Sequence, residues 1–113
     1  MNTNTDKIRE LNDDFRTNLF RKCENALLNL SQMVSCLPTT EQIQILDKVA
    51  KFNDFNEGNN PHAENDFGKV SYNGQDYFFK IDYYDNELKY HSPNPADPTQ
   101  TIRILTIMHV SEY

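Results

Sequence analysis

The sequence predicts an α+β fold in which two N-terminal helices pack on an antiparallel sheet of three or four strands. Up to residue 52 the apolar residues recur at steps of three and four, which is the spacing of an amphipathic helix. Beyond residue 66 the step becomes two, which is typical of a strand. At 113 residues the chain has room for one modest core. Residues 1–113 are therefore expected to form a single domain, with a helical part at 5–52 and a sheet part at 66–113.

Residues 5–30 are expected to form the first helix. Thr3 or Thr5 suits its N-cap, and Asp6 is favourable in the first turn. The stripe that faces the core consists of Ile8, Leu11, Phe15, Leu19, Cys23, Leu27 and Leu30. Residues 31–37 fit either a helical continuation or a short strand, and Pro38 ends this segment.

A second helix is expected over residues 39–52, because the run Thr39–Gln42 matches a capping box and precedes apolar residues at helical spacing. Residues 53–65 are polar and contain Gly58 and Pro61, which predicts a long loop. Long ordered loops in compact domains often carry function.

The sheet part begins with a predicted hairpin. Its strands are Phe67–Tyr72 and Gln75–Tyr84, and Asn73-Gly74 between them is a strong signal for a type I′ turn. A second tight turn at Asp85-Asn86 leads into an expected strand over Glu87–His91. The proline-rich segment 92–98 predicts a stiff, extended connection.

The last element, Thr101–Val110, reads as a strand covered on both faces, with a buried helical turn as the alternative. As a strand it places Leu105 and Ile107 on one face. In the long hairpin strand, one face carries Tyr77, Phe79, Ile81 and Tyr83 and is expected to meet the helices. The other face carries Phe78, Lys80, Asp82 and Tyr84, and it is polar enough to bind something.

The net charge of −6 comes from the C-terminal half. Seven basic and seven acidic residues balance in 1–52, whereas 53–113 holds four basic and ten acidic residues. This distribution argues against a nucleic-acid-binding protein, which needs a basic patch. It suits a basic protein surface, a cationic ligand or a divalent metal, and it is equally typical of ordinary solubility.

The N-terminal segment is charged and the chain has no run of 18 apolar residues, so we expect neither a signal peptide nor a membrane span, and a cytoplasmic protein. Cys23 and Cys36 show no metal or redox spacing and are expected to be reduced and buried. The serines lack a nucleophile elbow and the three glycines form no phosphate loop, so no cofactor and no complete catalytic set are expected.

Three charged constellations allow two interpretations each. His62, Glu64 and Asp66 alternate, which suits a divalent cation or an acid/base pair if the segment is extended, but carboxylates that fix the loop by accepting backbone N–H bonds are the favoured interpretation. Lys80, Asp82 and Arg103 suit a charged cluster on neighbouring strands, more typical of structural pairing than of catalysis. Arg16 pairs either with its helix neighbours Asn12-Asp13 or with Glu64 or Asp66 of the loop.

Several segments together resemble a small family of domains of unknown function. They are Leu11–Arg16, the loop 54–68 with Asp66-Phe67-Gly68, Lys80–Asp85, Ser92-Pro93 with Asp97-Pro98, Arg103–Met108 and Glu112-Tyr113. The family is found on proteobacterial plasmids, phages and integrated elements, so the resemblance implies a mobile genetic context but no activity. Where the family usually has Asp and His, this chain has Asn60 and Asn65. The missing His removes the best candidate for acid/base or metal chemistry.

The leading hypothesis is a non-enzymatic accessory protein of a phage or mobile element that binds and inhibits a host component. A defence complex, either a CRISPR effector or a restriction enzyme, is the natural target. Acidic side chains would imitate phosphates and occupy a basic groove of that partner. The carboxylates expected to do so are Asp54, Glu57, Glu64, Asp66, Asp82, Asp85 and Glu87.

The alternative hypothesis is a protein that binds a small molecule, a nucleotide or a metal, with a small hydrolase as one form of it. Its site would combine the polar sheet face with the loop 59–68. The residues expected to form it are His62, Glu64, Asp66, Lys80, Asp82, Tyr84 and Arg103. A structural or dimerising module is a third option.

Overall fold

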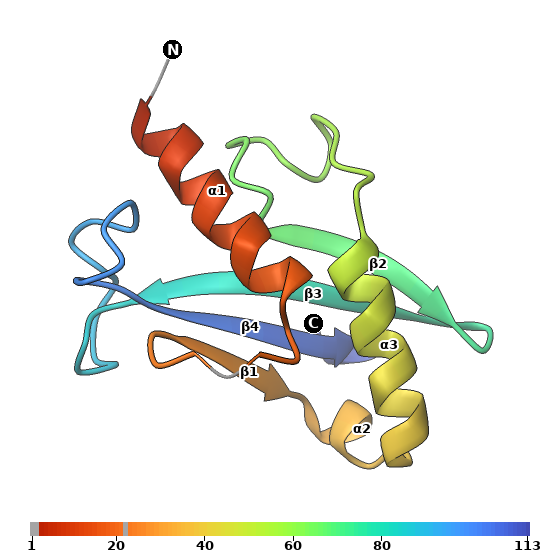
Figure 1. Cartoon of the computed structure of the whole chain (residues 1–113). Coiled ribbons are helices and arrows are strands. Elements are labelled where there is room, and N and C mark those ends of the chain that lie inside the picture. The colour runs from red at the N-terminus through yellow and green to blue at the C-terminus, as the bar shows by residue number, and fades with distance from the viewer. Residues whose placement is uncertain (1–2, 22) are drawn as a thin grey trace.

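The computed structural model describes residues 3–21 and 23–113 and shows a four-stranded sheet with helices on one face (Figure 1). In chain order the elements are α1 (Thr3–Thr17), β1 (Ala26–Leu30), α2 (Gln32–Ser35), α3 (Thr39–Lys51), β2 (Phe67–Tyr72), β3 (Gln75–Tyr84), β4 (Ile102–His109) and the 3₁₀ turn η1 (Val110–Glu112). The spatial order of the strands is β1-β4-β3-β2. The predicted α+β class is confirmed, but the sheet is mixed rather than antiparallel, because β1 runs parallel to β4.

The first helix is much shorter than predicted. It ends at Thr17, and residues 26–30 of the expected helix form a strand instead. At the end of α1 the side chain of Asn18 donates to the carbonyl of Asp14 at 2.8 Å, a local bond that competes with continued helix. Backbone hydrogen bonds to β4 hold β1 at both of its ends. The amide of Arg103 donates to the Asn25 carbonyl, and the amide of Ser31 donates to the Ile107 carbonyl. Long-range pairing therefore overrides the helical spacing of Cys23, Leu27 and Leu30.

Residues 31–37 contain one turn of helix, α2, with Ser31 as its N-cap. The second predicted helix is confirmed as α3, one residue shorter at its end. Its capping box is not formed, because Pro38 occupies the N-cap and offers no side-chain acceptor. The amide groups of Glu41 and Gln42 donate to the Pro38 carbonyl instead.

The predicted hairpin of β2 and β3 is confirmed, including its turn. Asn73 has φ of 52° and Gly74 has φ of 76°, the left-handed pair that a type I′ turn requires. The expected strand over Glu87–His91 is absent from the structure described, where only an isolated bridge joins Tyr84 to His91. Thr101–Val110 contains the strand β4, so the alternative of a helical turn is wrong.

The core lies between the sheet and the helices, on the predicted face of β3. Tyr77, Phe79 and Ile81 are buried there with Leu105 and Ile107 of β4, and Tyr83 packs at the margin. The helices contribute Val34 of α2 and Ile45, Leu46 and Val49 of α3. No helix in the described part of the chain is both long and apolar enough to cross a membrane. Cys23 and Cys36 are exposed, contrary to prediction, because Cys23 precedes β1 and Cys36 ends α2.

Candidate functional site

The loop 53–65 lies beside α1 and is held there by polar contacts (Figure 1). Nη1 of Arg9 donates to the Ala63 carbonyl at 3.0 Å, and Nδ2 of Asn65 donates to Oδ1 of Asp13 at 3.0 Å. The segment is not extended, since Ala63 and Asn65 have φ of 57° and 54°. The condition under which His62, Glu64 and Asp66 would project to one side, an extended segment, is therefore not met.

A buried polar network joins this loop to α1 and to two strands. Asn12 has no exposed surface; its Nδ2 donates to the Glu64 carbonyl at 3.0 Å and to the Tyr83 hydroxyl at 2.7 Å. Its Oδ1 accepts from Nε of Arg103 at 2.8 Å. The Tyr83 hydroxyl donates to Oε1 of Glu64 at 2.7 Å, and the guanidinium carbon of Arg103 lies 5.2 Å from the Tyr83 ring centroid. These four side chains act as one structural unit.

Glu64 and Arg103 are predicted site residues, whereas Asn12, the centre of the network, is predicted only as a helix neighbour of Arg16. A signal was present: Ile8, Asn12 and Arg16 recur at four-residue steps, and all three are buried on the inner side of α1. A polar residue in phase with the apolar stripe of a helix indicates a buried hydrogen-bonding group.

The pKa values of the network follow from its burial. Burial, and then the hydrogen bond to Glu64, raise the pKa of Tyr83 far above its ordinary range, so the phenol stays protonated and donates. Burial, and then the nearby charge of Glu64, raise the pKa of Asp66. The charges of Glu64 and, with the opposite sign, of His62 thus both act on Asp66, although His62 is exposed on the loop. Among the residues that the structure describes, no group of three or more His, Cys, Asp and Glu is placed to hold a metal ion.

Arg16 is a helix cap rather than a loop anchor. Its Nη1 donates to three carbonyls at the end of α3, those of Val49 at 3.1 Å, Ala50 at 3.0 Å and Phe52 at 2.7 Å. Its Nη2 lies 3.3 Å from Oδ1 of Asp13, which confirms the pairing with its helix neighbour. Arg16 does not bridge to Glu64 or Asp66; the link between helix and loop is made by Asp13 and Asn65.

The alternative ligand-binding residues are divided between the two faces of the sheet. Lys80 and Asp82 form an ion pair of 3.0 Å on the open face, where Tyr84 also lies. Arg103 pairs in register with Tyr83 and points to the helical face, so the predicted cluster of Arg103 with Lys80 and Asp82 is not formed.

The open face of the sheet is the face that the helices leave uncovered. Its wide, shallow depression is lined by Leu27, Leu28, Asn29, Lys80, Asp82, Tyr84, Ile104 and Thr106, from β1, β4 and β3. Towards β2 the face is aromatic, and the ring centroid of Tyr113 lies 6.0 Å from that of Phe67 and 5.3 Å from that of Phe78. The face thus combines apolar side chains with an internal ion pair between Lys80 and Asp82.

Four of the seven carboxylates expected to meet a partner have contacts within the chain. Glu64 is bonded to Tyr83, and Asp82 is paired with Lys80. Asp85 accepts from the Lys89 amide at 2.9 Å, and such backbone bonds lower the pKa of Asp85. Glu87 lies 3.6 Å from the Lys89 ammonium, although both side chains are mostly exposed. Asp54 and Glu57 are exposed on the loop, and Asp66 is half-buried before β2.

Comparison with known protein families shows a match over most of the chain. The model of a family described as "Protein of unknown function (DUF3768)" matches residues 30–112, which is most of the chain and includes all of the antiparallel part of the sheet. The residues of α1 that form the buried network precede the matched region. No curated protein and no solved structure matches the chain significantly.

Proposed function

The chain belongs to the DUF3768 family of proteins of unknown function, and we propose that it is a non-enzymatic protein that binds and inhibits a host protein. The observation that carries the proposal is the open face of the sheet. The helices lie on one face of the sheet and leave the other face uncovered (Figure 1).

The composition of the open face suits a protein partner. Leu27 is 41% exposed and Tyr113 is 77% exposed, and half-buried Ile104, Tyr84 and Phe78 lie on the same face. Apolar and aromatic side chains that are exposed together mark interaction surfaces in soluble proteins. Because Lys80 and Asp82 neutralise each other, the centre of this face can be covered at a modest electrostatic cost.

The charge around this centre favours a partner with a basic surface. Asp85 and Glu87 follow directly on β3, and the ten acidic residues of 53–113 outnumber the four basic ones. A basic groove that binds nucleic acid would attract this half of the molecule, which then competes with the phosphates. We therefore propose an accessory protein of a phage or mobile element whose target is a host defence complex, either a CRISPR effector or a restriction enzyme.

The test is nucleic-acid cleavage by purified defence nucleases of the host in the presence of the protein. We expect inhibition that is lost in the variant Leu27→Glu, which places a charge on the open face in the edge strand β1. The matched control is Ile43→Glu on α3, since Ile43 is 47% exposed and lies away from that face. The control should inhibit like the wild type. Equal inhibition by both variants, or no inhibition of any defence nuclease, contradicts the proposal.

A second pair of variants tests whether the charge of the surface contributes to inhibition separately from its shape. Exchanging the ion pair in Lys80→Asp/Asp82→Lys keeps the attraction between the two side chains and should leave the melting temperature unchanged. Glu87→Lys changes an exposed side chain after β3. We expect Glu87→Lys to weaken inhibition more at low than at high salt, because exposed charges are screened. A salt-independent loss would show that the acidic half does not steer binding.

The hydrolase alternative is not supported by an assembled site. Its residues lie on two faces of the sheet and on the exposed part of the loop, and Glu64 is committed to the Tyr83 hydroxyl.

A further inference from the structure

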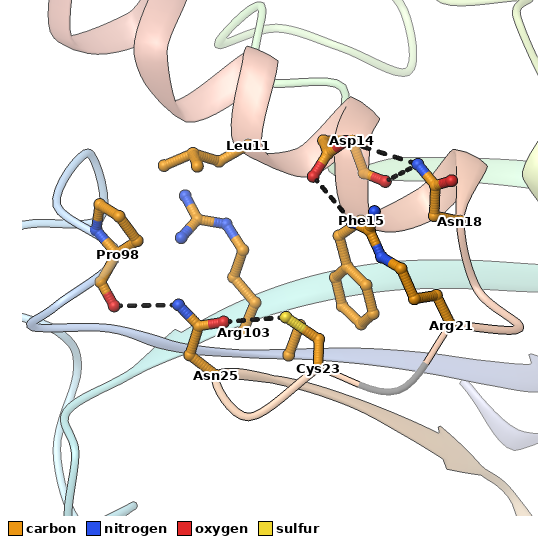
Figure 2. A pocket seen from close by; sticks show the side chains of 10 residues that line it. Leu11, Asp14, Phe15, Asn18, Arg21, Cys23, Asn25, Pro98 and Arg103 are labelled. Atoms are coloured by element: carbon orange, nitrogen blue, oxygen red, sulfur yellow. Dashed lines mark hydrogen bonds and ion pairs between the residues drawn. The ribbon is translucent and has the colours of Figure 1, made fainter.

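A small cavity lies between the second half of α1, the segment before β1 and the start of β4 (Figure 2). Its volume is 60 Å³, which is room for a few non-hydrogen atoms. One part of its wall is apolar and contains Leu11, Phe15 and Pro98. The guanidinium group of Arg103 lies between Leu11 and Pro98 in this view.

Arg103 brings a buried positive charge to this cavity. Its residue surface is only 4% exposed. Nε donates to Oδ1 of Asn12 and Nη2 donates to the Pro95 carbonyl, so both acceptors are neutral. Among residues 3–21 and 23–113, no carboxylate oxygen lies within 4.0 Å of this guanidinium. Burial lowers the pKa of Arg103, and the negative charge of Glu64, which acts on it without direct contact, offsets part of this effect. A guanidinium that touches no carboxylate retains part of the cost of leaving water.

The third nitrogen of Arg103 is available to a ligand. Within the described residues Nη1 makes no hydrogen bond, whereas Nε and Nη2 each make one. In the described part of the chain, Nε of Arg16 is the one side-chain nitrogen or oxygen that is both fully buried and without a hydrogen-bond partner. Nη1 of Arg103, which has no partner among these residues, is therefore not fully buried. It keeps some exposed surface, and the residue that carries it lines the cavity.

The rim of the cavity carries one further cation and one anion. Arg21 lies 3.3 Å from Oδ2 of Asp14, and the two side chains are 60% and 65% exposed. An exposed ion pair of this kind is worth at most about 1 kcal/mol, so Arg21 can turn from Asp14 to another anion. Among the described residues that line the cavity, Arg21 and Arg103 are positive and Asp14 is negative. One further negative charge balances these three.

We propose that this cavity binds a small monocarboxylate. The carboxylate accepts a hydrogen bond from Nη1 of Arg103 and a second one from Arg21, and a short hydrocarbon chain contacts Leu11 and Phe15. A phosphate dianion fits less well, because Asp14 repels the second charge. The site is distinct from the open face of the sheet, since Arg103 points to the helical face.

The test is a titration of the full chain with sodium propionate at constant ionic strength, followed by two-dimensional NMR and by thermal unfolding. We expect saturable shifts at residues that line the cavity, and a melting temperature that rises with propionate concentration. Inorganic phosphate at the same ionic strength should bind more weakly. Absence of saturable shifts with propionate overturns the proposal, and tighter binding of phosphate overturns the ligand class.

Two exposed positions allow variants that keep the fold. Asp14→Asn removes the repelling charge and should tighten propionate binding by up to about fivefold, whereas Arg21→Ala should weaken it by a similar factor. The matched controls are Asp47→Asn and Lys51→Ala, which change an exposed ion pair of 3.0 Å on α3. Both controls should bind like the wild type. Wild-type affinity in Asp14→Asn and Arg21→Ala would overturn the proposal.

Discussion

Asn12 of α1 and Arg103 of β4 are 91 residues apart in the sequence and are joined by a buried hydrogen bond of 2.8 Å. The same amide group of Asn12 donates to the Glu64 carbonyl and to the Tyr83 hydroxyl. One side chain therefore connects the first helix with the loop and with two strands. Removing the amide would take from the Glu64 carbonyl and from Nε of Arg103 the bond that Asn12 makes to each, and would leave the Tyr83 hydroxyl with its bond to Glu64 alone.

The variant Asn12→Ala should lower the free energy of unfolding by about 3 kcal/mol, because several buried polar groups lose a partner at once. Urea unfolding followed by circular dichroism measures this loss. The control is Asn29→Ala, since Asn29 is exposed and makes one long bond of 3.4 Å to Thr106. That variant should stay within about 0.5 kcal/mol of the wild type. Equal losses in the two variants would show that the network does not stabilise the fold.

Asp66 makes stability depend on pH in a defined direction. Burial and the charge of Glu64 raise its pKa above 3.8, so the folded state favours the protonated carboxyl group. This contribution to stability is fully present below pH 3.8 and is lost as pH rises through the raised pKa. Asp66→Asn should therefore melt at a higher temperature than the wild type at neutral pH, and the gain should shrink in acid.

The control for this prediction is Asp54→Asn, an exposed carboxylate of the same loop. Its melting temperature should follow that of the wild type at every pH. A gain in Asp66→Asn that is the same at neutral and acid pH would mean that the raised pKa of Asp66 is not its cause.

Gly68 in β2 is required by a close approach. A β-carbon there would overlap the ring of Phe79 and lie 2.9 Å from Cε2 of Phe52, both within the aromatic part of the core. Gly68→Ala should cost about 1–3 kcal/mol, because the rings have to leave their packed positions. In Gly58→Ala the new atom meets only Oδ1 of Asn56 at 3.1 Å, so unfolding in urea should be nearly unchanged. A harmless Gly68→Ala would contradict this packing.

Local pattern was sufficient for the hairpin and insufficient for the first strand. The alternation of Tyr77, Phe79 and Ile81 and the Asn73-Gly74 turn are properties of neighbouring residues, and both predictions are confirmed. Leu27 and Leu30 continue the helical spacing of α1 by coincidence of phase. Their strand is stabilised by pairing with β4. Because β4 is so distant in the sequence, this pairing cannot be detected in the spacing of neighbouring apolar residues.

The same contrast holds for the side chains of the candidate sites. Lys80 and Asp82 stand two residues apart on one strand, so their pairing follows from the period of a strand. Arg103, Leu105 and Ile107 follow one another at steps of two residues and therefore point to the same face of β4, the core side. The expected cluster of Arg103 with Lys80 did not take this alternation into account. The burial of Asn12 could not be predicted from its residue type, because a polar side chain is buried only where hydrogen-bond partners are present. Its partners are 52, 71 and 91 residues away in the sequence.

The pairing of β1 with β4 has a consequence for biosynthesis. Each residue of β1 lies opposite a residue of β4 that is 77 positions further along the chain. On the ribosome, Leu27 and Leu28 therefore emerge long before the strand that completes their ladder, and β3 has only one of its two neighbours until then. Such non-local closure is slow and leaves apolar segments open in the meantime. A nascent chain stalled before residue 102 is accordingly a client for chaperones and proteases rather than a smaller working version of the protein.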